Sequence, residues 1–195
     1  MPTGVAIREV RAKLFDAAER VLLRDGAAAL TSRAVTAEAD VAKGVLHRHF
    51  ADFDAFLAEL VADRIARVDT QAAALRDSAG TGTVTGNVTD ALIELFGPLA
   101  LSIVGLLIYR DGLRARMRDS HPAGIPYLAE GVRMLVAYLT AEREAGRIAA
   151  DADVHTPALM LIGSAHMLFA GQSGALPDRA AVHEVVEAAL VGAIR

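Results

Sequence analysis

Apolar residues recur with a helical period along nearly the whole chain, and this pattern constrains the fold more than any other feature of the sequence. No segment alternates as a half-buried β-strand does, and the β-branched stretch 82–86 is bracketed by glycines, so we interpret it as a loop. The chain is therefore predicted to be all-α, with about nine helices. One apolar stripe, which ends near Gly26, comprises Leu14, Ala17, Ala18, Val21 and Leu22. A second, which Asp52 can cap, comprises Phe53, Phe56, Leu57, Leu60, Val61, Ile65 and Val68.

The second half of the chain continues the helical pattern with clear interruptions. Residues 77–87 form a break, and a new apolar helix is predicted from near Val88. Pro98 is expected to start or kink the next helix, which runs towards Arg118 before a linker at residues 119–127. The remaining helices are predicted at residues 128–146, 156–171 and 179–194, the last two joined by residues 171–177.

Composition excludes several classes of protein. Of the 195 residues, 53% are hydrophobic and 23% charged, so the chain can bury a core and is not disordered. It contains no cysteine, which removes disulfides and Cys-based zinc sites and suits a reducing compartment. The N-terminus has no apolar run of the kind found in signal peptides, and the long uncharged stretch 154–177 holds two histidines, Pro157 and three glycines. We therefore expect a cytoplasmic protein without a membrane partner.

Charge is distributed unevenly along the chain. The first 50 residues carry eight basic and six acidic residues, whereas the remainder carries 12 basic and 18 acidic residues. A basic N-terminal part joined to an acidic body indicates that the N-terminal part meets a polyanion.

Between Gly26 and Asp52 the sequence predicts two very short helices joined by a tight turn. Thr31 can cap the first, which covers residues 32–39, and Asp40 stands where the chain must reverse in a left-handed conformation. The second covers residues 43–49 and is about 10 Å long, a length that fits one major groove of DNA. This is the helix-turn-helix geometry. The residues expected to face inward are Val35, Ala39, Val41, Leu46 and Phe50.

The outward face of the second short helix carries Lys43, Gly44, His47 and Arg48. Gly44 allows the backbone to approach a surface closely. A metal site or a catalytic pair at His47 and His49 is disfavoured, because residues two apart point to different sides of a helix. No Ser-His-Asp spacing, phosphate loop or metal-ligand cluster occurs elsewhere, so we expect neither an enzyme nor a cofactor nor a bound metal.

Residues 30–60, "LTSRAVTAEADVAKGVLHRHFADFDAFLAEL", resemble the DNA-binding head of the tetracycline-repressor (TetR) family of transcriptional regulators. "AAERVLLRDG" at residues 17–26 also resembles the family's first helix and its Gly stop. The positions that match are Thr31, Val35, Ala37, Val41, Lys43, Gly44, Leu46, His49 and Phe50.

The resemblance implies roles for individual residues. Thr31, Ser32, His47 and His49 would touch phosphates, Arg33 and Lys43 would reach base edges, and Arg48 could do either. Gly44 and Val45 complete the nine residues that the resemblance assigns to DNA binding.

At four positions the sequence departs from the family pattern, and each departure removes or alters a contact with the DNA backbone. Asp40 replaces the turn Gly, Val45 a phosphate-contacting Thr, His47 a Tyr, and Phe53 the Lys that pins the fourth helix to DNA. These departures leave open an alternative, in which the chain is a helical small-molecule-binding protein with weak or lost DNA binding.

In this family the later helices form a ligand pocket and a dimer interface, and the sequence allows both. Wide apolar faces on the last two helices need a partner, and Gly163 and Ser164 permit close approach. The residues of this expected interface are Val182, Val185, Val186, Ala189, Leu190 and Ile194 on the last helix, and Leu159, Leu161, Ile162, Ala165, Met167 and Leu168 on the preceding one. A mostly apolar pocket is predicted from Phe96, Leu99, Ile103, Leu107, Tyr109, Met134, Tyr138 and His166.

These observations predict a DNA-binding domain at residues 1–51 and a ligand-binding and dimerisation domain at residues 52–195. The predicted function is that of a homodimeric regulator, a repressor released from an inverted-repeat operator in double-stranded DNA by a small apolar ligand.

Overall fold

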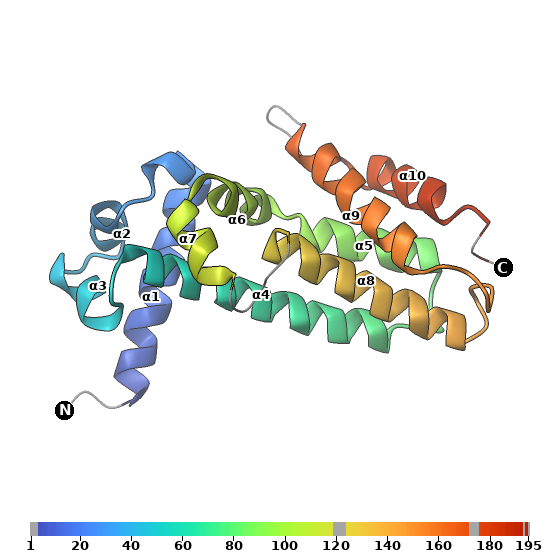
Figure 1. Ribbon diagram of the computed structural model, residues 1–195, viewed down its shortest axis with the longest axis horizontal. Helices are drawn as coiled ribbons and strands as arrows, with labels where there is room; N and C mark the ends of the chain where they lie inside the picture. The colour runs from blue at the N-terminus through green and yellow to red at the C-terminus, as the bar shows by residue number, and fades with distance from the viewer. Residues whose placement is uncertain (1–3, 119–123, 172–175, 193, 195) are drawn as a thin grey trace. The chain divides into compact units, whose positions relative to one another are not determined.

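The computed structural model describes residues 4–118, 124–171, 176–192 and 194. Within these residues the chain forms ten α-helices and one short 3-10 helix, η1, in the order that Figure 1 shows. The prediction of an all-α fold is confirmed, and the predicted number of helices is one too low. One isolated antiparallel bridge joins Ile148 to Ile194.

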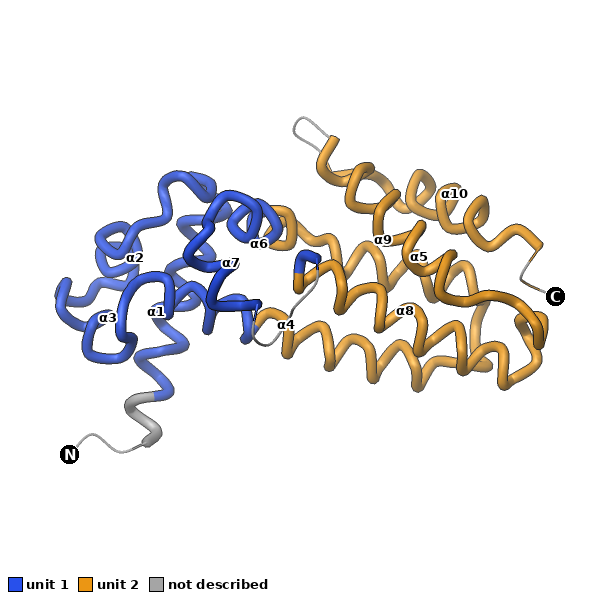
Figure 2. Tube along the Cα trace, viewed as in Figure 1, with its two compact units in different colours: residues 1–63, 102–125 blue, residues 64–101, 126–195 orange. Residues whose placement is uncertain are grey.

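The chain folds into two compact units, which Figure 2 distinguishes by colour. Unit 1 comprises Met1–Asp63 and Ser102–Ile125, and unit 2 comprises Arg64–Leu101 and Pro126–Arg195. The chain thus passes from one unit to the other inside α4 (Phe53–Asp77), inside α6 (Pro98–Tyr109) and between Ile125 and Pro126. The functional division at residues 51 and 52 remains a prediction.

Unit 1 is built around α1 (Gly4–Asp25), followed by η1 (Ala27–Ala29), α2 (Ser32–Glu38) and α3 (Gly44–His49). It also contains the start of α4, the end of α6 and α7 (Asp111–Met117). The first predicted apolar stripe is the core of this unit, since all its members are at most 1% exposed: Leu14, Ala17, Ala18, Val21 and Leu22.

Aromatic rings fill the space between α1 and the start of α4. The ring centroids of Phe50 and Phe56 lie 5.0 Å apart in an edge-on arrangement, and Phe15 lies within 6 Å of both. Asp52 caps α4, because its Oδ1 accepts a 2.7 Å hydrogen bond from the backbone N–H of Ala55. The cap and the second apolar stripe were both predicted, although Phe53 is only half-buried.

Unit 2 contains α5 (Val84–Leu95), α8 (Pro126–Glu144), α9 (His155–Ala170) and α10 (Arg179–Leu190), together with most of α4. Helix α5 packs on α8 and α10, and α9 packs on the same two helices. Gly131 permits the close approach of α8, because a Cβ there would lie 2.8 Å from side-chain atoms of Leu95 and Ile162. Buried Tyr127 donates a 2.9 Å hydrogen bond to the backbone oxygen of Leu95.

Two local predictions are wrong. The stretch 82–86 is not wholly a loop, because the Thr83 hydroxyl accepts a hydrogen bond from Gly86 N at 3.0 Å and starts α5 at Val84. The helix predicted from Pro98 to Arg118 is two helices, because Arg110 has an extended backbone and separates α6 from α7. Residues 119–123 of the predicted linker and residues 172–175 of the predicted α9–α10 connection lie outside the described residues.

The expected dimer interface also needs correction, because much of it is core within one chain. The members that are at most 2% exposed are Leu161, Ile162, Ala165, Val182, Val186 and Leu190. Ile194 lies beyond the end of α10 and takes part in the bridge to Ile148. The apolar residues of α9 that remain on the surface are Leu159, Met160 and Met167, which are 56%, 54% and 72% exposed.

Candidate nucleic-acid interface

The start of α2 is fixed by Thr31, as the sequence predicted. Its extended backbone ends the preceding segment, and its Oγ1 accepts a 3.1 Å hydrogen bond from the backbone N–H of Ala34. Val35 and Thr36 are buried, and the Thr36 hydroxyl donates to Ser32 O at 2.9 Å. Arg33 therefore lies on the exposed side of the first turn of α2.

The turn between α2 and α3 depends on Asp40, whose φ is +49°. This is the predicted left-handed residue, and it is the one non-Gly residue with positive φ in the described part of the chain. The turn is closed by a 3.0 Å hydrogen bond from Val41 N to Thr36 O. Two helices of seven and six residues joined in this way form the predicted helix-turn-helix.

Leu46 and Phe50 anchor α3, since they are 0% and 4% exposed. His49 is half-buried, and its backbone oxygen accepts a 3.2 Å hydrogen bond from Arg11 Nη1 of α1. The guanidinium of Arg11 also lies 4.4 Å from the centre of the Phe50 ring. These contacts hold the inner face of α3 against the rest of unit 1. Val45, also in α3, is half-buried.

The outer face of α3 is open to solvent, with Lys43, Gly44, His47 and Arg48 exposed. Among the described residues outside its own helical turn, no atom lies within 4 Å of a Cβ added to Gly44. Packing against these residues therefore does not require glycine at this position, and its missing side chain leaves room for an external surface.

Five of the nine predicted DNA-contacting residues line one shallow hollow of about 410 Å³. They come from the first turn of α2 and from α3 with its N-cap, and none is acidic. The lining residues are Ser32, Arg33, Lys43, Gly44 and His47. Thr31, which caps α2, and Val45, Arg48 and His49 of α3 do not line the hollow.

Sequence reasoning missed a pair of arginines that bind the start of α4. Arg110 donates from Nη2 to Leu30 O at 2.8 Å, and its Nη1 lies 3.7 Å from Asp54 Oδ1. Arg116 forms an ion pair and hydrogen bond with Asp52 Oδ2. The signal in the sequence was four arginines within residues 110–118.

The predicted ligand-contacting residues are divided between the two units. Ile103, Leu107 and Tyr109 belong to unit 1, where the first two are buried and Tyr109 is 83% exposed. The other five belong to unit 2: Phe96, Leu99, Met134, Tyr138 and His166.

Within unit 2, the Phe96 ring lies 6.2 Å from the His166 ring and 5.5 Å from the Phe169 ring. Nδ1 of His166 is buried and has no hydrogen-bond partner among the residues that the structure describes. Tyr138 instead joins a polar network, accepting from Asn87 Nδ2 at 2.9 Å and donating to Glu142.

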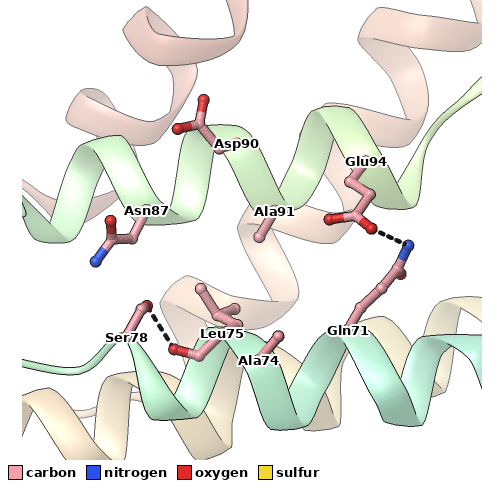
Figure 3. A pocket seen from close by; sticks show the side chains of 8 residues that line it. All are labelled: Gln71, Ala74, Leu75, Ser78, Asn87, Asp90, Ala91 and Glu94. Carbon is pink, nitrogen blue, oxygen red and sulfur yellow. Dashed lines mark hydrogen bonds between the residues drawn. The ribbon is translucent and has the colours of Figure 1, made fainter.

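An open groove of about 190 Å³ lies between α4 and α5 of unit 2 (Figure 3). Gln71 Nε2 donates to Glu94 Oε1 at 3.0 Å at one end, and Ser78 and Asn87 lie at the other. None of the eight residues predicted to line a ligand pocket lines this groove.

Within the described residues, no single helix is long and apolar enough to cross a membrane, and α5 and α6 meet that test only as a bent pair.

Comparison with known families gives a match to the N-terminal part of the chain, which contains the helix-turn-helix. Residues 14–60 match the model of the family described as "Bacterial regulatory proteins, tetR family". No curated protein matches the chain significantly.

Solved structures resemble the chain over its full length. A putative TetR-family transcriptional regulator from Mesorhizobium loti MAFF303099 has a TM-score of 0.71 and 16% identity, with 100% of each chain covered. The multidrug binding protein EbrR, solved with malachite green, has a TM-score of 0.62 and 25% identity, covering 92% of this chain and 96% of its own. A TetR-family member from Streptomyces coelicolor A3 has a TM-score of 0.64 and 23% identity, covering 93% and 98%.

The helix-turn-helix at residues 32–49, the family match that includes it and the all-helical likeness beyond it agree with one another. Residues 14–60 are thus similar to bacterial regulatory proteins of the tetR family, and the chain as a whole shares its fold with solved TetR-family proteins.

Proposed function

We propose that the chain is a TetR-family transcriptional regulator, a homodimeric repressor that binds an inverted repeat and is released by a small, largely apolar ligand. In this proposal residues 1–51 bind the DNA, and residues 52–195 bind the ligand and form the dimer. The observation that carries it is the solvent-open hollow lined by cationic and polar side chains at the ends of α2 and α3.

The chemistry of the hollow fits the edge of a major groove. Arg33 and Lys43 are exposed and can donate to guanine O6 and N7. Thr31, Ser32, His47 and His49 offer donors for phosphates, and Arg48 can reach either phosphate or base. Gly44 and the half-buried Val45 leave the backbone of α3 free to come close to the groove.

A dimer would determine the symmetry of the DNA site. Leu159, Met160 and Met167 are exposed apolar residues on one helix, and Gly163 and Ser164 between them are also exposed. Such a surface suits close packing against the same surface of a second copy. Two heads related by two-fold symmetry select half-sites related by the same symmetry, about 34–36 Å apart.

The proposed ligand lies beside Phe96 and His166 in unit 2. The unpaired Nδ1 of His166, set against two aromatic rings, offers a single polar handle in apolar surroundings. The likeness to EbrR, a multidrug binding protein solved with an organic dye, supports a ligand of this kind. Release requires the ligand to bind the DNA-incompetent state more tightly than the competent one.

The decisive experiment is selection from random duplex DNA with the full chain. We expect an inverted repeat, and a loss of about 1–3 kcal/mol in binding when Arg33 or Lys43 is replaced by Ala, with relaxed preference at particular base pairs. Arg76→Ala is the matched control, since this exposed arginine belongs to unit 2. Equal binding by Arg33→Ala, Lys43→Ala and Arg76→Ala would show that the hollow does not read DNA.

A second candidate function is small-molecule binding without strong DNA binding. It is favoured by Phe53, whose ring is covered by the Arg110 guanidinium at 5.2 Å and carries no cation of its own. Thermal-shift screening of apolar compounds, followed by titration of each hit into the protein–DNA complex, separates the two. A stabilising hit whose effect is lost in His166→Ala, from a protein that selects no DNA sequence, would establish the second candidate.

A further inference from the structure

Two acidic side chains stand at the beginning of α4, immediately after the helix-turn-helix. Asp52 is three residues from His49, so their Cα atoms are at most about 11 Å apart. The side chains of Asp52 and Asp54 are 49% and 38% exposed. If α3 lies in the major groove, the Asp52 carboxylate is about one Debye length from the DNA backbone, where its charge repels phosphates.

Each carboxylate is paired with an arginine that comes from the α6–α7 segment. Arg116 binds Oδ2 of Asp52, while Arg110 lies 3.7 Å from Asp54 and is held in place by its 2.8 Å hydrogen bond to Leu30 O. A Cβ at Gly112 would collide with Asp54 Oδ2, so the first turn of α7 lies directly against this carboxylate. All of these residues belong to unit 1.

We propose that Arg110 and Arg116 are positioning residues for DNA binding, which neutralise Asp54 and Asp52 beside α3 without themselves contacting the DNA. The inference rests on the proposed DNA-binding function of the head. The groups that determine affinity for DNA would then include two arginines of the α6–α7 segment, which follows the helix-turn-helix only after α4 and α5.

The two oxygens of Asp52 have separate tasks, which makes the proposal testable. Oδ1 accepts from Ala55 N at 2.7 Å and caps α4, whereas Oδ2 binds Arg116. Asn at position 52 keeps an oxygen for the cap and removes the negative charge, because Asn is also a good N-cap residue. The charge of Asp52 can therefore be removed while α4 keeps its start.

The experiment measures the dissociation constant for a labelled duplex recovered by selection, and for a mixed-sequence duplex of equal length. Arg116→Ala should weaken binding about threefold to tenfold at about 0.1 M salt, because the Asp52 charge is then uncompensated. The ratio of the dissociation constants of Arg116→Ala and wild type should approach one as the salt concentration rises, because salt screens the charge of Asp52. Asp52→Asn in the Arg116→Ala background should restore binding to within about twofold of wild type.

Arg114→Ala is the matched control. Arg114 is on the same short helix and pairs with Asp111 of that helix, so its loss removes one positive charge but exposes no carboxylate at the start of α4. Binding should change less than about twofold. A loss equal to that of Arg116→Ala would mean that only the total charge matters, and would overturn the proposal.

Thermal unfolding distinguishes a role of Arg116 in DNA binding from a role in stabilising the fold alone. Asp52→Asn cannot rebuild the lost ion pair, so the double variant should regain DNA affinity while its Tm stays at or below that of Arg116→Ala. If DNA affinity is not restored, Arg116 touches the DNA or only stabilises the head, and the proposal is overturned. A wild-type chain that binds neither duplex would instead refute the proposed function, and this inference with it.

Discussion

Arg20 of α1 donates a 2.7 Å hydrogen bond from Nε to Oε1 of Glu38, at the end of α2. Arg24, one turn further along α1, binds the other oxygen, Oε2, at 2.8 Å. These hydrogen bonds, first from Arg20 and then from Arg24, lower the pKa of the Glu38 carboxyl below its ordinary value of 4.5. The first helix of the helix-turn-helix is thereby fastened to α1 in a pH-dependent way.

Replacing Glu38 by Gln should reduce the loss of stability in acid. A carboxyl with a lower pKa in the folded state contributes stability that is present above 4.5 and is lost as pH falls through the folded-state pKa. The Tm of wild type should therefore fall more steeply than that of Glu38→Gln below pH 4.5. Differential scanning calorimetry from pH 6 to 3 measures this, with exposed Glu144→Gln as control. If the Tm of wild type and that of Glu38→Gln fell equally with pH, the ion pairs of Glu38 would not contribute to the loss of stability in acid.

The helix starts, the tight turn and the buried faces of α1 and α4 could be predicted because their signals are local in sequence. Thr31, Asp40 and Asp52 have short polar side chains at positions where the backbone must start a helix or reverse, and each acts there as predicted. The apolar spacing of α1 and α4 likewise identified their buried faces.

What could not be predicted depends on contacts between distant residues. Arg110, whose extended backbone separates α6 from α7, donates to Leu30 O, 80 residues earlier in the chain. Val186 looks like an interface residue by its spacing, but α10 turns that face onto α5 and α9 of its own chain. Periodicity shows which face is apolar and does not show what covers it.

Asp40 should tolerate glycine better than any β-branched residue. At φ +49° an ordinary side chain costs about 1–2 kcal/mol, which glycine avoids. Asp40→Gly should therefore unfold at or above the wild-type denaturant midpoint, whereas Asp40→Val should lose about 1–2 kcal/mol. Chemical denaturation of both variants measures the difference. A Val variant as stable as wild type would mean that the turn takes another conformation.

Tyr138→Phe should destabilise unit 2 although it removes only one oxygen. The hydroxyl is fully buried, donates to Glu142, which is also 0% exposed, and accepts from Asn87 Nδ2 at 2.9 Å. Burial and the Glu142 carboxylate raise the pKa of this phenol, so it stays a donor at neutral pH. We expect a loss of about 1–3 kcal/mol in the free energy of unfolding. Tyr109→Phe is the matched control, since this ring is 83% exposed and should change stability by less than about 0.5 kcal/mol.

The surface of α9 should decide whether the chain is a dimer. Wild type should scatter light as a particle of about twice 20.5 kDa at micromolar concentration. Met167→Glu, at a side chain that is 72% exposed, should give monomers because each interface would bury unpaired charge.

Two further variants make the dimer test specific to the face of α9. Val186→Arg should instead unfold the chain, since this residue is 0% exposed inside one copy, and so it does not report on association. Leu23→Glu, at an exposed apolar residue of α1, should remain dimeric. A Met167→Glu variant that keeps the wild-type mass and Tm would mean that α9 does not form the interface. A wild type that is monomeric at 100 µM would remove the basis for an inverted-repeat operator, because one head reads only one half-site.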